Sequence, residues 1–367
     1  MKFTSRYLKL LGNEKSAPGS IPCIALLHNE KNILPDFLQH YRSLGNVAFF
    51  IVDDRSDDGS RELLERQPDV TLFEPEEWSS YKEHKREWRS DLLDSYADGR
   101  WVMVPDLDEH FVYHDMERLD LAGLTGLLEA EGAEALLTIM VDMYADKPLS
   151  GHHYAGGGLL EAFPYFDADT DPVTGYRLLP PATRFLKKYP TPRILAFGGM
   201  RDRLFFSRSS SAAGFQALML RKYAHMKRPL NPGPFDRFMN SLARRTTRSL
   251  FSSEPFVCSK IGLLKWSRGM RFSGGAHAVT ARLRTSESIA AFLHFKFTKG
   301  VAGIEYIANR GQHAGEGLYY KQILHNAELL ERSPVFESSV RFVSSASLAP
   351  LIRKASQDHS DGPLQEA

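Results

Sequence analysis

The stretch RWVMVPDLDEHFVY, residues 100–113, joins an apolar run to a cluster of acidic residues. The apolar residues at 101–104 are typical of a buried strand, and Asp106, Asp108 and Glu109 follow where that strand would end. In an extended segment Asp106 and Asp108 point to the same side, so both can reach one hard divalent cation that carries nucleotide phosphates. An acidic turn without a metal is the alternative, and the stretch alone leaves both open.

Three other apolar runs also end in polar residues, and segments with helical spacing separate them. The runs are IPCIALL at 21–27, VAFFIV at 47–52 and ALLTIMV at 135–141. Strands that alternate with helices predict an α/β fold with a mostly parallel, Rossmann-like sheet flanked by helices. Ligands of such sheets bind at the carboxyl ends of the strands, so we expect the polar residues after each run to share one rim.

The sequence predicts one domain in two halves. Residues 1–19 are expected to be an N-terminal extension, and residues 20–150 a Rossmann-like half that binds the nucleotide. Beyond Pro148 the strand and helix pattern breaks up, so residues 151–335 are expected to form a loop- and helix-rich half on the acceptor side. Residues 336–367 are expected to be a peripheral tail, disordered from Ser356.

Composition is that of an ordinary globular chain. Of the 367 residues, 43% are hydrophobic and 25% are charged, which argues against a mostly disordered protein. No apolar run approaches the roughly 18–20 residues that span a bilayer, and the first residues lack the apolar stretch of a signal peptide. We therefore expect a cytoplasmic protein, with Cys23 and Cys258 as core residues.

The net charge of +1 hides a strong segregation of charge along the chain. Residues 53–120 contain 21 Asp and Glu against 9 Lys and Arg, a net of −12, whereas residues 184–284 contain 21 Lys and Arg against 3 acids, a net of +18. Such a basic region suggests an anionic partner. We rank a phosphate-bearing substrate first, peripheral contact with an anionic membrane second and nucleic acid last, and we expect no nucleic acid.

Four motifs together resemble those of the bacterial family 2-like glycosyltransferases. They are LLHNE at 26–30, VAFFIVDDRSDDGS at 47–60, the Asp-x-Asp of residues 100–113 and LHFKF at 293–297. The resemblance implies a GT-A fold, a nucleotide-sugar donor and an essential divalent metal, Mn²⁺ or Mg²⁺. It covers roughly residues 20 to 300.

The resemblance also implies roles for individual residues. Asp106 and Asp108 match the pair that holds the metal, and His294 matches the late histidine that completes its coordination. The nucleotide would be bound by residues that follow the first two strands, with basic residues adding charge at the phosphates: His28, Asn29, Asp53, Asp54, Arg201, Arg203 and Lys296.

The catalytic base is not marked in the sequence. An inverting transfer needs a group that deprotonates the acceptor hydroxyl, and Asp142, Glu109 and Glu161 are candidates, with Asp142 preferred. The predicted function is metal-dependent transfer of a sugar from a nucleotide sugar, with a UDP-sugar preferred, to a carbohydrate or lipid-linked saccharide; inversion is preferred, and a retaining mechanism that needs no such base stays open. The alternatives are a metal-dependent nucleotidyltransferase or phosphohydrolase and a catalytically silent saccharide-binding module.

Overall fold

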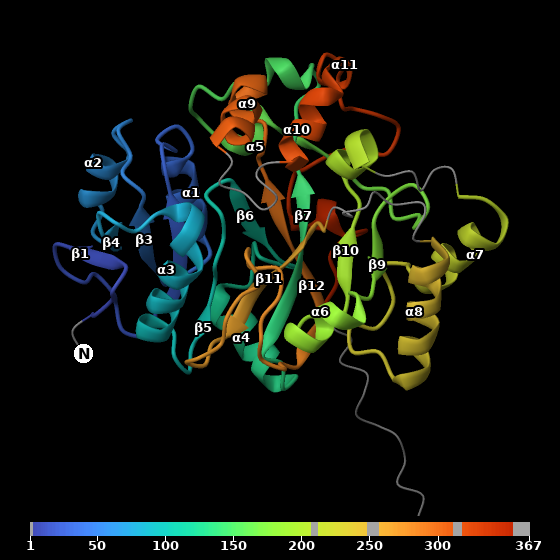
Figure 1. Ribbon diagram of the computed structural model, residues 1–367, viewed down its shortest axis with the longest axis horizontal. Helices are drawn as coiled ribbons and strands as arrows, with labels where there is room; N and C mark the ends of the chain where they lie inside the picture. The colour runs from blue at the N-terminus through green and yellow to red at the C-terminus, as the bar shows by residue number, and fades with distance from the viewer. Residues whose placement is uncertain (1–2, 207–211, 248–256, 311–317, 355–367) are drawn as a thin grey trace, which may run out of the picture.

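The computed structural model describes residues 3–206, 212–247, 257–310 and 318–354. It has a mixed α/β fold in which sheets form the middle and helices cover both faces (Figure 1). The sheet of the N-terminal half lies at one end of the long axis, and helices α7 (Gly214–Tyr223) and α8 (Pro234–Thr247) lie at the other end.

The N-terminal half forms a Rossmann-like unit. Its strands β2 (Ile21–Leu27), β3 (Val47–Asp53) and β4 (Val70–Pro75) are parallel neighbours, and α1 (Leu34–Ser43) and α2 (Ser60–Glu65) connect them. The segment before β2, predicted to be an N-terminal extension, contains β1 (Leu8–Leu11), which pairs antiparallel with β4. Buried Leu8 gives this edge strand its anchor in the core.

The second sheet is more mixed than the sequence predicts. Its strand order is β5–β11–β7–β12–β6, in which only β7 and β12 are parallel neighbours. Its strands are β5 (Trp101–Val102), β6 (Glu109–Val112), β7 (Ala135–Asp142), β11 (Ser259–Lys265) and β12 (Thr285–His294). A parallel bridge between Cys23 and Met103 joins this sheet to β2.

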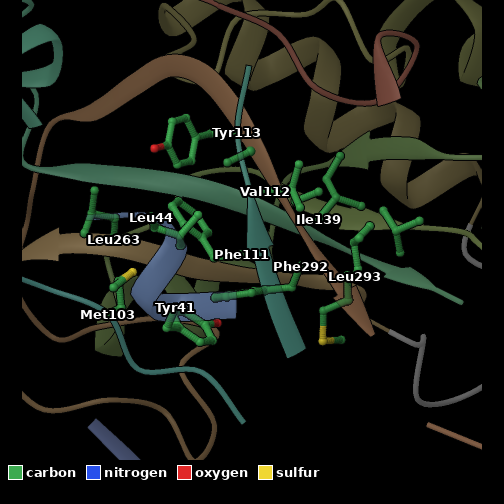
Figure 2. Packing of buried hydrophobic residues seen from close by; sticks show 14 of the residues in the cluster. Tyr41, Leu44, Met103, Phe111, Val112, Tyr113, Ile139, Leu263, Phe292 and Leu293 are labelled. Carbon is green, nitrogen blue, oxygen red and sulfur yellow. The ribbon is translucent and has the colours of Figure 1, made fainter. Parts of the chain in front are cut away.

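Alternating side chains of the strands pack into two separate cores. Cys23 and Phe49 lie in the core that contains α1 and α4 (Leu121–Ala130), whereas Ile24 and Phe50 lie in the core that contains α3 (Tyr81–Tyr96). This alternation follows from the period of two in a strand. Figure 2 shows Tyr41 of α1 packed in one cluster with aromatic residues of β6 and β12.

The remaining elements are short and lie around the second sheet. Near the carboxyl end of β7 are the helices α5 (Leu159–Ala162), α9 (Gly300–Arg310), α10 (Leu318–His325) and α11 (Ala327–Leu330) (Figure 1). The other elements are β8 (Tyr165–Asp167), β9 (Arg177–Leu179), α6 (Thr183–Lys188), β10 (Leu195–Phe197) and β13 (Ser339–Arg341).

The expected peripheral tail is wrong in part. β13 pairs with β8, and the side chains of Leu348, Leu351 and Ile352 are buried in the main core. The residues from 355 onward, where disorder is predicted, lie outside the described part of the chain.

Two further predictions concern the cysteines and membrane-spanning segments. Both cysteines are buried with free thiols, as predicted. Within the described ranges, no helix combines the length and the apolar character that crossing a membrane requires.

Candidate active site

A cavity of about 1240 Å³, here called the main cavity, lies where strand ends, α3 and α9 meet. Nine of the twelve residues predicted for the site line it: His28, Asn29, Asp54, Asp106, Asp108, Glu109, Arg201, His294 and Lys296. Asp53, Asp142 and Arg203 do not line it. The main cavity therefore gathers predicted residues that lie up to 268 positions apart, from His28 to Lys296.

The acidic turn that follows β5 is held by its own backbone. Asp106 N–H donates to the Glu109 carboxylate at 2.9 Å, and Glu109 N–H donates to the Asp106 carbonyl at 3.1 Å. β5 ends before Pro105, as expected of a residue that cannot donate to the ladder. The turn therefore presents the side chains of Asp106 and Asp108 at fixed positions.

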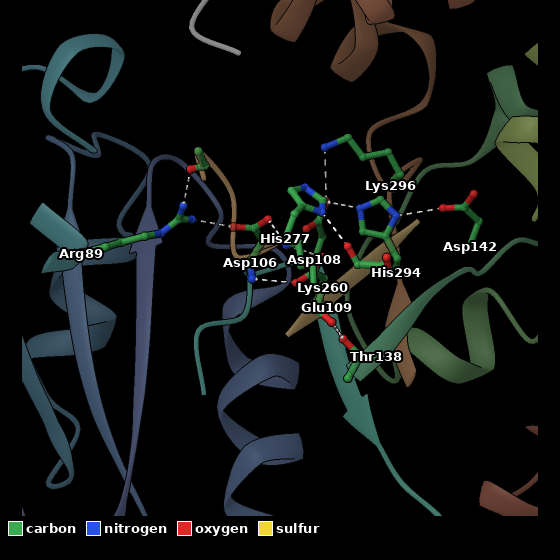
Figure 3. A network of polar contacts seen from close by, with 12 residues as sticks. Arg89, Asp106, Asp108, Glu109, Thr138, Asp142, Lys260, His277, His294 and Lys296 are labelled. Carbon is green, nitrogen blue, oxygen red and sulfur yellow. Dashed lines mark hydrogen bonds and ion pairs between the residues drawn. The ribbon is translucent and has the colours of Figure 1, made fainter. Parts of the chain in front are cut away.

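Lys260 of β11 is the counter-ion of this turn. Its ammonium lies 2.6 Å from Glu109 Oε1 and also contacts Asp106 Oδ2, while Arg89 of α3 contacts Asp106 Oδ1 at 3.0 Å (Figure 3). Desolvation would raise the pKa of Asp106, but the Lys260 and Arg89 charges outweigh it and hold that pKa well below its usual range. Burial raises the pKa of Glu109 in spite of Lys260.

Asp108 faces a second set of cations. Its Oδ2 lies 3.5 Å from His294 Nε2 and 3.4 Å from the Lys296 ammonium (Figure 3). Desolvation would raise the pKa of Asp108, but Lys296 and His294 hold it well below its usual value. Asp108 is therefore a carboxylate at neutral pH.

Asp142, the preferred base in the sequence analysis, lies behind the cavity wall. Its Oδ1 lies 2.9 Å from His294 Nδ1 and accepts a 2.8 Å hydrogen bond from Arg201 Nε, and its Oδ2 accepts one from the Arg201 backbone. Burial would raise its pKa, but Arg201 and His294 keep that pKa well below the usual range. In this arrangement Asp142 orients Arg201 and His294, and it does not line the main cavity.

The three residues predicted to hold the metal are only partly brought together. Asp108 Oδ2 and His294 Nε2 face each other, whereas both oxygens of Asp106 contact Arg89 and Lys260. Among the residues that the structure describes, no three His, Cys, Asp or Glu side chains converge on one point. Since Mg²⁺ is often bound through one or two carboxylates plus substrate phosphates, Asp108, with the His294 nitrogen beside it, fits such a site without Asp106.

Of the residues predicted to bind the nucleotide, some line the main cavity and others do not. His28 Nδ1 donates to the Asp54 carbonyl at 2.7 Å, and both residues line the cavity with Asn29. Asp53 is instead fully buried against Arg61, at 2.6 Å.

The last predicted residue outside the main cavity is Arg203. Its guanidinium contacts Asp167 at 2.9 Å and stacks on Phe336, with 3.8 Å from Cζ to the ring centroid. Like Asp53, Arg203 is held by an ion pair that supports the fold.

The basic face of α3 was not predicted from the sequence. The helix begins at Tyr81, and Lys82, Lys85, Arg86 and Arg89 line the main cavity. Their spacing of i, i+3, i+4 and i+7 puts them on one helix face, so this signal was present in the sequence. Lys260 carried no comparable signal, because its strand pairing decides where it points.

His277 is a second residue that the sequence analysis missed. Its Nδ1 lies 2.7 Å from the Ser259 carbonyl, which can only accept, so the neutral ring carries its lone pair on Nε2. Burial and the nearby Lys260 charge lower the pKa of His277 to about 4. His277 lines the main cavity as a neutral hydrogen-bond acceptor.

Comparison with known proteins leaves the family open. No model of a protein family matches the chain, and no curated protein matches it. The resemblance to family 2 glycosyltransferases is therefore not confirmed.

Two solved structures are similar over about a third of the chain. One is 4-diphosphocytidyl-2C-methyl-D-erythritol synthase, at 17% identity with a TM-score of 0.24, over 36% of this chain and 64% of that one. The other is a putative glucose-1-phosphate thymidylyltransferase from Bacillus anthracis in complex with sucrose, at 9% identity with a TM-score of 0.24, over 35% and 56%. The matched part thus spans less than two thirds of either neighbour.

Proposed function

We propose that the protein is a metal-dependent glycosyltransferase that takes a nucleoside diphosphate sugar, preferably a UDP-sugar, as donor. The acceptor would be a carbohydrate or a lipid-linked saccharide. The observation that carries the proposal is the main cavity, where Asp108 and His294 face each other beside the Lys296 ammonium. At about 1240 Å³ it exceeds the roughly 300–1,000 Å³ typical of one small ligand, which leaves room for donor and acceptor together.

The charges of the main cavity suit a diphosphate. Eight Lys and Arg and seven Asp and Glu line it, and most of these carboxylates are already paired with a cation. Lys296, Arg201 and the basic face of α3 would place positive charge beside the phosphates of a donor. Bound by Asp108, His294 and the donor phosphates, a divalent cation would supply Lewis-acid stabilisation of the leaving nucleoside diphosphate.

We assign the base to His277 in preference to Asp142 and Glu109. Transfer breaks the bond between the anomeric carbon and the diphosphate oxygen, joins that carbon to the acceptor oxygen and moves the acceptor proton to the base. Both Glu109 oxygens are engaged, by Lys260 and by the Asp106 N–H, whereas His277 Nε2 carries a lone pair. A pKa of about 4 gives His277 roughly the basicity of a carboxylate.

The first test is calorimetric binding of UDP and GDP, each with and without Mn²⁺. We expect UDP binding that depends on the metal and that weakens about tenfold or more in Asp108→Asn. Asp115→Asn is the matched control, since this carboxylate is 54% exposed and lies outside the main cavity. If neither nucleotide binds under any metal condition, the proposal fails.

Product analysis separates the alternatives. A glycosyltransferase releases UDP from a UDP-sugar only when acceptor or water takes the sugar, whereas a nucleotidyltransferase exchanges pyrophosphate with a nucleoside triphosphate. We expect UDP release and no pyrophosphate exchange. We also expect His277→Gln to lower kcat with little change in the KM for the donor.

A further inference from the structure

A second cavity, of about 680 Å³, lies between α6 and α8 and is lined by five arginines. We call it the arginine cleft, after Arg193, Arg237, Arg244, Arg245 and Arg282. None of the described residues that line it is acidic. Such a concentration of guanidinium groups favours an anion with several oxygen acceptors, such as a phosphate.

One buried polar group also points to a ligand. Asn240 lines the arginine cleft and is only 1% exposed, and its Nδ2 has no hydrogen-bond partner within the described residues. A buried donor without a partner costs free energy, which an oxygen of a bound anion would recover. The arginine cleft therefore combines positive charge with an unused hydrogen-bond donor.

Helix α8, which lines the arginine cleft, and α7, which packs against α8, expose large apolar side chains. Phe235 and Phe238 of α8 are 71% and 66% exposed, and Phe215 and Leu218 of α7 are 60% and 58% exposed. α7 and α8 pack against each other at the end of the molecule opposite the N-terminal sheet (Figure 1). Arg245 follows Phe238 by seven residues, so the two lie on the same side of α8, two turns apart.

We propose that the arginine cleft and the exposed side chains of α7 and α8 form a docking surface for a bilayer that contains anionic phospholipid. Arginines would bind the lipid phosphates, and the phenylalanines would enter the interface, as in amphipathic helices that lie on membranes. A second copy of this chain suits the surface less well, because it would bring the same five arginines and repel them. The proposal does not depend on the function of the main cavity.

The test is sedimentation of the full chain with vesicles of phosphatidylcholine, alone or mixed with phosphatidylglycerol. We expect binding only to the mixed vesicles, weakening as sodium chloride is added. Arg237→Gln together with Arg245→Gln should reduce the partition coefficient about thirtyfold, which corresponds to about 1 kcal/mol for each arginine.

The control for the arginine pair is Arg66→Gln with Arg118→Gln. It removes the same charge from exposed positions outside the cleft, and it should change binding much less.

A second pair of changes tests the apolar side chains. Phe235→Ser with Phe238→Ser should abolish the binding that persists at high salt.

For these apolar changes the matched control is Leu127→Ser with Val343→Ser, at residues that are 40% and 81% exposed on other elements. An unchanged thermal unfolding midpoint will show that each variant is folded.

Three outcomes would overturn the proposal. The first is equal binding to vesicles with and without phosphatidylglycerol, and the second is an equal loss in the cleft pair and its control. The third is calorimetric binding of inorganic phosphate that requires Arg237 and Arg245 while no vesicle binds, which would identify a soluble phosphorylated ligand instead.

Discussion

The main cavity and the arginine cleft both gather basic side chains, but they differ in what balances the charge. In the main cavity, Lys260 contacts Asp106 and Glu109, and Arg201 contacts Asp142. In the arginine cleft, no carboxylate lies among the described lining residues. Paired charges hold a site in one geometry and make it depend on each partner, whereas arginines in a lining without carboxylates add affinity for anions and little to the fold.

The strongest test of this difference removes Lys260. Lys260→Met leaves the buried Glu109 carboxylate without its cation, so we expect the free energy of unfolding to fall by about 3–5 kcal/mol. Urea denaturation measures the loss. The matched control is Lys265→Met on the same strand, where the partner Glu129 is 53% exposed and the expected change is within about 1 kcal/mol. Equal losses would contradict the comparison.

A smaller loss of unfolding free energy is expected for a change where β11 pairs with β7. Gly262 lies at the irregularity in that pairing, and a Cβ added there would come within 2.1 Å of Thr138 Cγ2. Gly262→Ala should therefore cost about 1–3 kcal/mol by overpacking, measured in the same urea titration. Thr138→Ser removes the obstructing methyl group and keeps the hydroxyl that donates to the Lys260 carbonyl. If Gly262→Ala lowers the free energy of unfolding as much in the presence of Thr138→Ser as in its absence, close packing at Gly262 is not the cause.

The third test uses pH, because the main cavity contains titratable groups. The folded pKa of His277 is about 4, below its usual value of 6.5, so the folded state binds fewer protons than the unfolded state between those values. The stability that His277 contributes is complete above about pH 6.5 and is lost as the pH falls toward about 4. His277→Gln should therefore make the free energy of unfolding depend less on pH in this window. An unchanged slope in chemical denaturation would show that His277 does not titrate as described.

The smallest effect is expected in the arginine cleft. Arg237 and Arg245 are exposed and make no ion pair among the described residues, so replacing both with Gln should change the free energy of unfolding by no more than about 0.5 kcal/mol. Thermal and urea denaturation would measure it. A large destabilisation would mean that these arginines support the fold and are not reserved for a ligand.

Much of the N-terminal half could be predicted from the sequence. The apolar runs became β2, β3 and β7, because each is long enough and apolar enough to be buried on both faces. The antiparallel pairings of β1, β6 and β11 were not predicted, since a strand's partners depend on distant segments. The same holds for the C-terminal residues that pack in the core.

The candidate site shows the same division. Asp106 and Asp108 were identified by their spacing, but their different partners were not, because Arg89 and Lys260 come from separate elements. Asp53 and Asp54 are neighbours in sequence, yet one is paired beneath the surface and the other lines the main cavity. Alternation along an extended strand sends neighbouring side chains to opposite sides, and only the folded structure decides which side holds the ligand.

The sequence by itself determined which segments are apolar enough to form strands, where acidic residues end them and where basic residues concentrate. Only the tertiary structure decided which charges meet, because ion pairs such as Lys260 with Glu109 join residues 151 positions apart. It also gathered Arg193, Arg237, Arg244, Arg245 and Arg282 in one cleft whose described lining residues include no carboxylate. Local pattern fixes secondary structure and burial, while the pairing of charges requires the distances that only packing sets.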